Sequence, residues 1–443
     1  MSAALRRPFA SLAVPNYRRY FVGQIVSLSG NWMQVVAEMW LVLSLTGSGL
    51  AVGLTSALQF LPLLLFGAWG GLIADRVDKR SLLSVTQALM AAPALILWAA
   101  TTQGVVQPWM VYALVFVRGT INSVDNPTRQ SFAIEMVGSD RLVNAVSLNS
   151  VLIHSARILG PAGAGVLIAT LGVGPCFLIN ALSFGAMIVA LRLMDPRELR
   201  PAPVAGRGGG AVRAGLRYVR RTPALAIPLG MMAVVGTLGF NFQVLLPLLA
   251  RFSFHGDASV YTLLAVAMGI GSVIGALAAG ARGRVGPRLL VAAAAGFGAV
   301  ALVAAGAPTL TLEALALIPL GAASVTFAAG VNSSLQLAAE PAMRGRVMAL
   351  YSIVFLGSTP IGGPLAGWLS EAIDPRAGLV LAGAAGLFAA LAARSAFARV
   401  GGQEEGQDRR PAPVTLRRPR RGAAEGDARR ASDRGRGRAS APA

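Results

Sequence analysis

The amino-acid sequence predicts an all-α integral membrane protein, in which twelve transmembrane helices form two pseudo-symmetric six-helix bundles. Charged residues make up only 13% of the chain, against about 25% in soluble domains, and the mean hydropathy is +0.62. Long uncharged runs, such as 47–74 and 81–117, lie on either side of short charged loops. Because a bilayer core of about 30 Å takes roughly 20 apolar residues per helix, each run is long enough to span a membrane.

The apolar runs and the Gly, Pro and charged residues between them place the spans and the domains. Twelve candidate spans lie at about 21–45, 50–74, 81–103, 108–127, 143–169, 174–194, 223–249, 258–281, 287–306, 311–337, 346–370 and 376–396. We expect an N-terminal six-helix bundle at 1–194 and a C-terminal one at 223–398. The cytoplasmic linker 195–222 contains a short amphipathic segment, which is either interfacial or solvated. The Arg-rich residues 399–443 predict a disordered basic cytoplasmic tail.

The distribution of basic residues predicts the orientation. Nearly all of the 39 Lys and Arg residues fall in the termini and in alternate loops. Since cytoplasmic loops attract Lys and Arg, both termini should be cytoplasmic, in a multi-pass protein of the cell membrane. The net charge of +20 does not indicate a nucleic-acid partner, because no aromatic residue interleaves the Arg residues of the tail.

The two halves of the chain repeat one pattern. The segments 148–151 (LNSV) and 350–353 (LYSI) each follow a basic loop. The glycines that come after them recur at the same offset, Gly160 with Gly362 and Gly165 with Gly367. Parallel repeats about an axis normal to the membrane are one way in which transporters are built, so the repeat favours two equivalent bundles.

The loop between the second and third predicted spans has the sequence GLIADRVDKR at 71–80. It resembles the corresponding loop of major facilitator superfamily transporters. The resemblance implies a latch in which Asp75 faces the N-terminus of helix eleven, near Arg346, where free N–H groups favour an anion. It also implies that Asp125, at the end of helix four, binds a basic residue of the loop. The expected latch residues are Gly71, Asp75, Arg76, Lys79, Arg80 and Asp125, with Arg76 or Arg80 as the partner of Asp125. The alternative is a basic loop that only orients the protein.

Two charged residues, Glu38 and Arg118, lie inside predicted spans one and four at comparable depth. Inserting a lone Arg at mid-span costs about 2.5–3.5 kcal/mol or more, so the side chain needs a cavity or a partner. The resemblance to drug/proton antiporters of this superfamily implies that such a couple links proton and substrate. We therefore hypothesise that Glu38 is the protonatable group and Arg118 its partner. A fixed structural ion pair is the alternative.

Helix five carries Gly160, Pro161 and Gly165 in a segment that resembles the Gly-Pro motif of antiporters, which favours export. Small residues let helix backbones approach closely, and a proline bends a helix. Helix eleven repeats the pattern, so the expected pivots between the halves are Gly160, Pro161, Gly165, Pro360, Gly363 and Gly367. Ordinary helix packing is the alternative.

His154 and Arg157 lie one turn apart on one face of helix five. His154 either relays protons or packs against polar neighbours. Arg157 either lines a cavity or pairs with a carboxylate from a neighbouring helix. Both residues are candidates for the proton-coupling and cavity site together with Glu38 and Arg118.

Further segments resemble the exporter branch of transmembrane secretion effectors, which includes enterobactin-type siderophore exporters and macrolide or multidrug efflux proteins. They are 16–24, 30–34, 125–130, 144–150 and 344–351. The resemblance implies a secondary active transporter that exports a drug-like compound, siderophore or secondary metabolite by alternating access, through proton antiport. Solute uptake or lipid flipping is the alternative, followed by a non-transporting membrane sensor.

The sequence contains no catalytic or metal-binding constellation. Its one Cys and two His residues provide no disulfide framework and no Cys/His metal cluster. A phosphate-binding loop of the ATPase type is absent, which disfavours ATP-driven transport. We expect no enzyme activity and no cofactor, a proton gradient as the energy source, and a monomer whose partners are its small-molecule substrate and the lipid bilayer.

Overall fold

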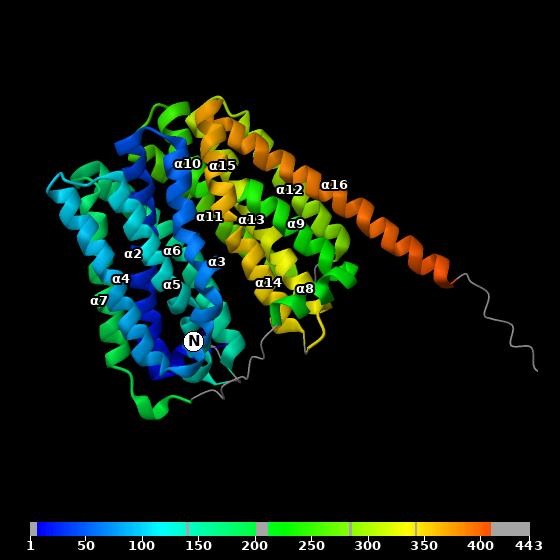
Figure 1. Ribbon diagram of the computed structural model, residues 1–443, viewed down its shortest axis with the longest axis horizontal. Helices are drawn as coiled ribbons and strands as arrows, with labels where there is room; N and C mark the ends of the chain where they lie inside the picture. Colours follow the sequence, from blue (N-terminus) through cyan, green and yellow to red (C-terminus); the bar gives the residue numbers. More distant parts are fainter. Residues whose placement is uncertain (1–6, 139–140, 201–210, 283–285, 342, 409–443) are drawn as a thin grey trace, which may run out of the picture. The chain divides into compact units, whose positions relative to one another are not determined.

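The computed structural model describes residues 7–138, 141–200, 211–282, 286–341 and 343–408, and in this part of the chain every regular element is a helix. Residues Met1–Val400 form one compact unit and Gly401–Ala443 a second. The N-terminal half contains η1 (Arg7–Ala13), α2 (Pro15–Thr46), α3 (Gly49–Arg76), α4 (Lys79–Thr102), α5 (Pro108–Val137), α6 (Leu142–Leu171) and α7 (Gly174–Arg192). The C-terminal half contains α9 (Pro223–Gly239), α10 (Phe242–Leu248), η4 (Leu249–Ser253), α11 (Ala258–Arg282), α12 (Pro287–Ala305), α13 (Leu310–Ala338), α14 (Arg344–Gly357), α15 (Thr359–Ala372) and α16 (Pro375–Asp408) (Figure 1).

These helices supply the twelve predicted spans in two halves of six, and two spans are built from shorter helices. One consists of α9, α10 and the π-helical turn η4. The other consists of α14 and α15, which meet at Ser358. Pro360 accounts for this break, because its ring lacks the backbone N–H and collides with the preceding turn.

Ten spans in the described residues are long and apolar enough to cross a membrane by composition alone. The two that are not among them are α2 and α5, although they are 32 and 30 residues long. These are the helices that contain Glu38 and Arg118. Length therefore does not set them apart; their low hydropathy does, to which these charges and neighbouring polar side chains contribute.

Glycines bring the same pair of helices into backbone contact in each half. In the N-terminal half, a Cβ atom on Gly70 of α3 would lie 2.1 Å from the carbonyl oxygen of Ser123 in α5. In the C-terminal half, a Cβ atom on Gly271 of α11 would lie 1.8 Å from the carbonyl oxygen of Ile318 in α13. Spans two and four thus pack as spans eight and ten do, which is the expected pseudo-symmetry.

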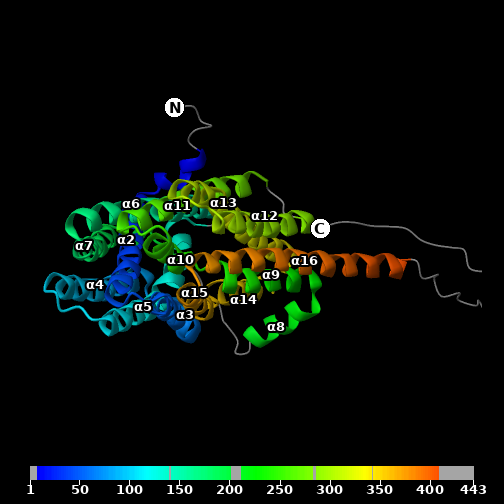
Figure 2. The same ribbon diagram turned by 90° about the horizontal axis from the view of Figure 1, so that it is seen from above.

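The two halves meet along two further helix pairs, α3 with α15 and α6 with α11 (Figure 2). A Cβ atom on Gly49 would lie 2.6 Å from the carbonyl oxygen of Gly367, and one on Gly53 2.4 Å from that of Gly363. Going from the first contact to the second, the residue number rises in α3 and falls in α15, so these two helices are antiparallel. On the other side, a Cβ atom on Gly165 would lie 2.5 Å from the Thr262 methyl group.

The linker between the halves contains η3 (Pro196–Glu198) and α8 (Ala211–Arg221), the predicted amphipathic segment. Helix α8 packs on α9 and α14, with Val219 buried. The backbone N–H of Glu340 donates to the Tyr218 hydroxyl at 3.3 Å. The face of α8 that carries Val219 is therefore covered by protein. The preceding part of the linker, 201–210, lies outside the described residues. Helix α16 continues past 399, where the predicted tail begins, and the predicted disorder of 409–443 also lies outside them.

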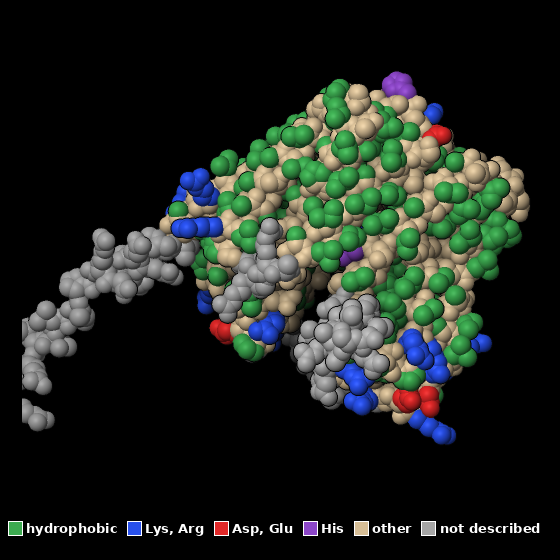
Figure 3. Space-filling view, turned by 180° about the vertical axis from the view of Figure 1, so that it is seen from behind, with side chains coloured by type: hydrophobic (Ala, Val, Ile, Leu, Met, Phe, Trp, Pro, Cys, Tyr) green, Lys and Arg blue, Asp and Glu red, His purple; other side chains and the backbone are tan. Residues whose placement is uncertain are grey.

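The surface separates apolar and basic side chains. Apolar side chains cover the middle of the face in Figure 3, and most Lys and Arg side chains lie toward one end. We call this end the basic face; η1, the C-terminal ends of α3, α5 and α7, and the N-terminus of α14 lie there. The N-terminal ends of α3 and α7 and the C-terminal end of α15 lie at the opposite face.

Candidate functional site

A cavity of about 630 Å³ lies among the helices of the N-terminal half. Its deep end is lined by Val35, Gln59 and Arg118, near the middle of their helices. Its other end is lined by Tyr17 and Leu142, close to the ends of α2 and α6 at the basic face. The cavity therefore runs from mid-depth toward the basic face. Gln243 of α10 is the one lining residue from the C-terminal half among those described.

The deep end of the cavity holds a buried ion pair between α2 and α5. Glu38 is 0% exposed and Arg118 4% exposed. The Arg118 Nη2 atom lies 2.6 Å from Glu38 Oε2, and Nη1 donates to Asn31 Oδ1 at 3.0 Å. The Arg118 Nε atom is buried without a hydrogen-bond partner. The structure thus brings together the two charges that the sequence places at similar depth, and each offsets the cost of burying the other.

A chain of amides extends the ion pair to α7. Gln34, one turn before Glu38, donates from Nε2 to Glu38 Oε1 at 2.7 Å. Asn180 of α7 donates in turn to the Gln34 carbonyl oxygen. The Glu38 carboxylate therefore has a partner at each oxygen, and a hydrogen bond from a third helix fixes the orientation of Gln34.

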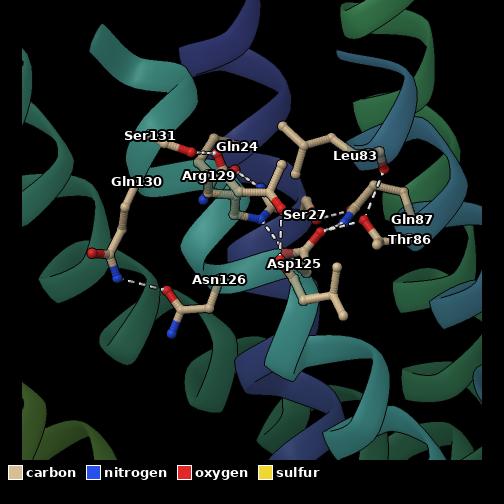
Figure 4. A network of polar contacts seen from close by, with 12 residues as sticks. Gln24, Ser27, Leu83, Thr86, Gln87, Asp125, Asn126, Arg129, Gln130 and Ser131 are labelled. Carbon is tan, nitrogen blue, oxygen red and sulfur yellow. Dashed lines mark hydrogen bonds and ion pairs between the residues drawn. The ribbon is translucent and has the colours of Figure 1, made fainter. Parts of the chain in front are cut away.

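A second polar network lies nearer the basic face, around Asp125 (Figure 4). Arg129, one turn later on α5, pairs with Asp125 and also donates to Gln24 of α2. From α4, Thr86 Oγ1 and Gln87 Nε2 donate to Asp125 Oδ1 at 2.6 Å and 2.9 Å. Both charged residues line the cavity, as Arg118 does at its deep end, whereas Glu38 lies behind Arg118.

The expected partner of Asp125 is corrected by this network, because Asp125 binds Arg129 and not Arg76 or Arg80. The sequence places the end of helix four at 127, which would put Asp125 at the membrane surface. Helix α5 instead continues to Val137, so Asp125 is buried within it. A membrane helix tolerates an internal Pro127 because neighbouring groups satisfy the freed backbone atoms.

The basic loop after α3 is tied to the N-terminal half by its last two predicted latch residues. Lys79 pairs with Glu135 of α5 at 2.6 Å, and Arg80 donates to the carbonyl oxygens of Leu191 and Arg192 at 2.7 Å and 3.0 Å. Arg80 therefore caps the C-terminal end of α7, where carbonyl groups lack helical partners. Asp75 is partly buried in the last turn of α3, Gly71 is buried and Arg76 is exposed.

At the opposite face, a carboxylate joins the two halves. Glu371, at the C-terminal end of α15, accepts hydrogen bonds from Ser48 Oγ at 2.7 Å and from the Leu50 N–H at 2.9 Å. These groups form the N-terminus of α3, where free N–H groups favour an anion. Together with the Gly49–Gly367 contact, they hold the two halves against each other at this face.

The residues predicted as pivots fall into two groups. Gly165, Gly363 and Gly367 lie in contacts between the halves, against Thr262, Gly53 and Gly49 respectively. Gly160 lies inside the N-terminal half, where a Cβ atom would be 2.5 Å from the Trp32 Cβ atom. Pro161 lies within α6, and Pro360 begins α15. Their role as pivots stays a prediction.

Arg157 of α6 stacks on Trp32 of α2, with the guanidinium carbon 5.2 Å from the ring centroid. Its Nε atom is buried without a hydrogen-bond partner, and none of the ion pairs among the described residues includes it. Of the two expectations for Arg157, the pairing with a carboxylate is therefore not observed. His154 is partly buried, and its Nδ1 atom has no partner.

The sequence profile of the transmembrane secretion effector family matches residues 6–419. The chain belongs to this family. Its members are transporters of the major facilitator superfamily, which are not enzymes, and this chain is accordingly a multi-pass membrane protein.

This secretion effector resembles two curated relatives at modest identity. It is 25% identical to the staphyloferrin A transporter of Staphylococcus aureus over 264 residues, 58% of this chain and 65% of that protein, which is just under two thirds. It is 23% identical to macrolide efflux protein A of Streptococcus pyogenes over 388 residues, 82% and 91% of the two chains. The nucleoside transporter NupG has the same fold, with a TM-score of 0.68 at 14% identity over 86% of this chain and 99% of that one.

Two contacts of the site in this secretion effector are not predicted from its sequence. Asp125 and Arg129 have the i, i+4 spacing of a helical ion pair, a signal that is lost when helix four is ended at 127. Glu371 is separated by most of the chain from Ser48, and no local pattern connects the two. An acid at the end of one span and a serine at the start of another are the only signal.

The cavity predicts selective thiol labelling in this secretion effector. Cys176 is the single cysteine and is fully buried, so the native background should be low. An Asn149→Cys thiol lies on the cavity wall and should react with a membrane-impermeant maleimide in vesicles that expose the basic face. A Thr55→Cys thiol, buried in α3, serves as the matched control and should stay unlabelled. Equal labelling at the two positions would contradict the cavity.

Proposed function

We propose that this protein exports a small organic molecule across the cytoplasmic membrane by alternating access, in exchange for protons. The observation that carries the proposal is the fully buried Glu38 carboxylate, paired with an Arg118 side chain that lines the cavity at mid-depth. Intramembrane ionisable residues are costly and mark substrate or proton pathways. A proton that reaches Glu38 therefore acts on the wall of the substrate cavity.

The charge asymmetry supports a cytoplasmic basic face. Because Lys and Arg are enriched in cytoplasmic loops, the basic face and both termini belong in the cytoplasm. The cavity then takes its substrate from the cytoplasm, while the contacts at Gly49 and Glu371 close the outer side. This is the arrangement that an exporter needs for loading.

Proton binding at Glu38 would change the charge of the cavity wall. Protonation neutralises the carboxylate and leaves Arg118 without its opposite charge, and a buried charge without a partner is strongly unfavourable. The wall then has one more positive charge when the proton is bound than when it is absent. Substrate affinity and proton affinity are therefore linked, and each changes the other by the same factor. Exchange requires this linkage to be negative, so that a bound proton lowers the affinity for the substrate.

The name of the macrolide efflux relative supports export over uptake. One relative is named as a macrolide efflux protein and one as a staphyloferrin A transporter. A drug-like compound, a siderophore or a secondary metabolite is accordingly the proposed substrate, carried by a monomer in the lipid bilayer. Uptake or lipid flipping would instead raise cellular accumulation of the solute or leave it unchanged.

The antiparallel contact of α3 with α15 suggests how the two gates alternate. Toward the basic face, α3 next approaches α14, where a Cβ atom on Gly357 would contact the Leu64 side chain, so the end of α3 with Asp75 lies on the side of the N-terminus of α14. We propose that Asp75 caps α14 when the cytoplasmic side is closed, as Glu371 caps α3 when the outer side is closed. The two carboxylates would then hold opposite faces in turn.

The proposed export and the proposed proton coupling can be tested separately, the coupling with the variant Glu38→Gln. Cells that produce the wild-type protein should retain less of its substrate, tested with a panel of macrolides and siderophores, than cells without it. In inverted vesicles, Glu38→Gln should lose transport driven by a pH gradient but keep substrate exchange without a gradient, because Gln cannot release a proton. The fully buried Glu313 of α13, outside the cavity lining, provides the matched control Glu313→Gln, which should keep both activities. Proton-driven transport by Glu38→Gln at the wild-type rate would exclude the coupling role.

The two-gate proposal predicts opposite shifts in cavity access. Asp75→Asn should strongly reduce transport without impairing membrane insertion. Because the contact that closes the cytoplasmic side is weakened, the Asn149→Cys thiol should stay at least as reactive from the cytoplasm. Glu371→Gln should lower that reactivity, because the outer contact is weakened and outward-open molecules gain population. Asp374→Asn, an exposed acid near the same outer end, is the control. Wild-type transport by Asp75→Asn would refute the latch.

A further inference from the structure

We propose that Arg157 and Trp32 form the binding site for an anionic group of the substrate, which makes the transported molecule an organic anion. The proposal rests on the export function above and specifies the chemical class of the substrate. Exchange of an anion for a proton then requires that the rearrangement of the Arg118 side chain on protonation of Glu38 opposes substrate binding more than its freed charge favours it. It starts from a guanidinium that the protein itself leaves uncompensated.

Helix α6 directs Arg157 toward the deep end of the cavity. Asn149 and Ile153 line the cavity from α6, and Arg157 follows at the next helical turn on the same face. Trp32, on which Arg157 stacks, also lines the cavity. The guanidinium therefore lies behind an aromatic wall residue, one turn deeper than the last α6 side chain on that wall.

The charges around the cavity do not cancel. Arg118 is paired with Glu38, and Arg129 is paired with Asp125. Arg157 has no carboxylate partner among the described residues, and its buried Nε atom has no hydrogen-bond acceptor. A buried polar group without a partner is costly, so its acceptor is expected to come from a ligand.

The surrounding groups fit a carboxylate attached to an apolar or aromatic body. A planar guanidinium can bind a carboxylate through two parallel N–H bonds, and it does so while stacked on an aromatic ring. Gln59 and Gln243 line the same cavity, and each has a buried side-chain carbonyl oxygen without a partner, which fits a hydroxyl or N–H donor on the body of the ligand. Phe60 and Phe184 add aromatic wall, and about 630 Å³ falls within the usual size of small-molecule sites.

Gln243 gives the site a link to the second half of the protein. It belongs to α10, whereas Arg157, Trp32 and Gln59 belong to the N-terminal half. A ligand that reaches from Arg157 to Gln243 contacts both halves at once. Such a ligand can favour one arrangement of the halves over the other, as alternating access requires.

The test compares two dyes of similar ring system and opposite charge, anionic carboxyfluorescein and cationic rhodamine 123. Binding to the purified full-length protein is measured by equilibrium dialysis, with monodispersity checked for each variant. The wild type should bind the anionic dye more tightly than the cationic one. Arg157→Gln should weaken binding of the anionic dye about tenfold or more and leave the cationic dye unaffected or improved.

Two further variants keep the result interpretable. Arg157→Lys keeps the charge but loses the planar fork, so it should weaken anion binding by a smaller factor, and it carries the test if Arg157→Gln does not fold. Arg251→Gln removes an exposed arginine at the opposite face and should change neither affinity. An equal loss for both dyes in the Arg157 variants would assign Arg157 a structural role and overturn the proposal. Absence of anion binding, or a preference of the wild type for the cation, would do the same.

Export is measured separately with the same dyes in inverted vesicles. Anion-selective binding without transport of either dye would sustain the site and count against the proposed export. Transport of the cationic dye alone would sustain export and overturn the anion site. The two proposals therefore fail in different measurements.

Discussion

The burial of two opposite charges in the middle of the membrane constrains the rest of this structure. Glu38 and Arg118 lie in α2 and α5, the two spans outside the ten that length and composition identify. Each charge is tolerable only while the other is within reach, so the two helices must lie at a fixed depth relative to each other. Gln34 and Asn180 extend the same requirement to α7. The polar cavity lies where these helices meet, because the charges need a polar environment that lipid does not supply.

Backbone contacts through glycine give this polar centre a rigid frame. Within each half, spans two and four or eight and ten approach until a Cβ atom would overlap a carbonyl oxygen. Between the halves, similar contacts occur at the outer end of α3 and α15, next to Glu371. Helices that touch so closely at one end and enclose a cavity toward the other are suited to a rocking movement of two stiff units. The proposed proton coupling would then need only a group whose change of charge acts on the cavity wall.

Much of the fold follows from the sequence, because apolar length, loop charge and the internal repeat are local signals. The pairing of Glu38 with Arg118 also follows, since two intramembrane charges of opposite sign at one depth have few other partners available. The partner of Asp125 does not follow from the sequence. When the helix is ended at 127, Arg129 falls in a loop, and its i, i+4 spacing from Asp125 no longer indicates a helical ion pair. The Glu371 contact at the start of α3 depends on tertiary packing across most of the chain, and the unpaired state of Arg157 depends on which carboxylates the fold leaves out of reach.

The central claim is that Glu38, the partner of Arg118 on the cavity wall, takes up and releases a proton. Infrared difference spectroscopy on the purified protein, recorded as the pH is lowered, observes this directly through the carbonyl band of a protonated carboxylic acid. The account predicts a band in the wild type that is missing in Glu38→Gln and retained in Glu313→Gln. Identical difference spectra for the wild type and Glu38→Gln would contradict it.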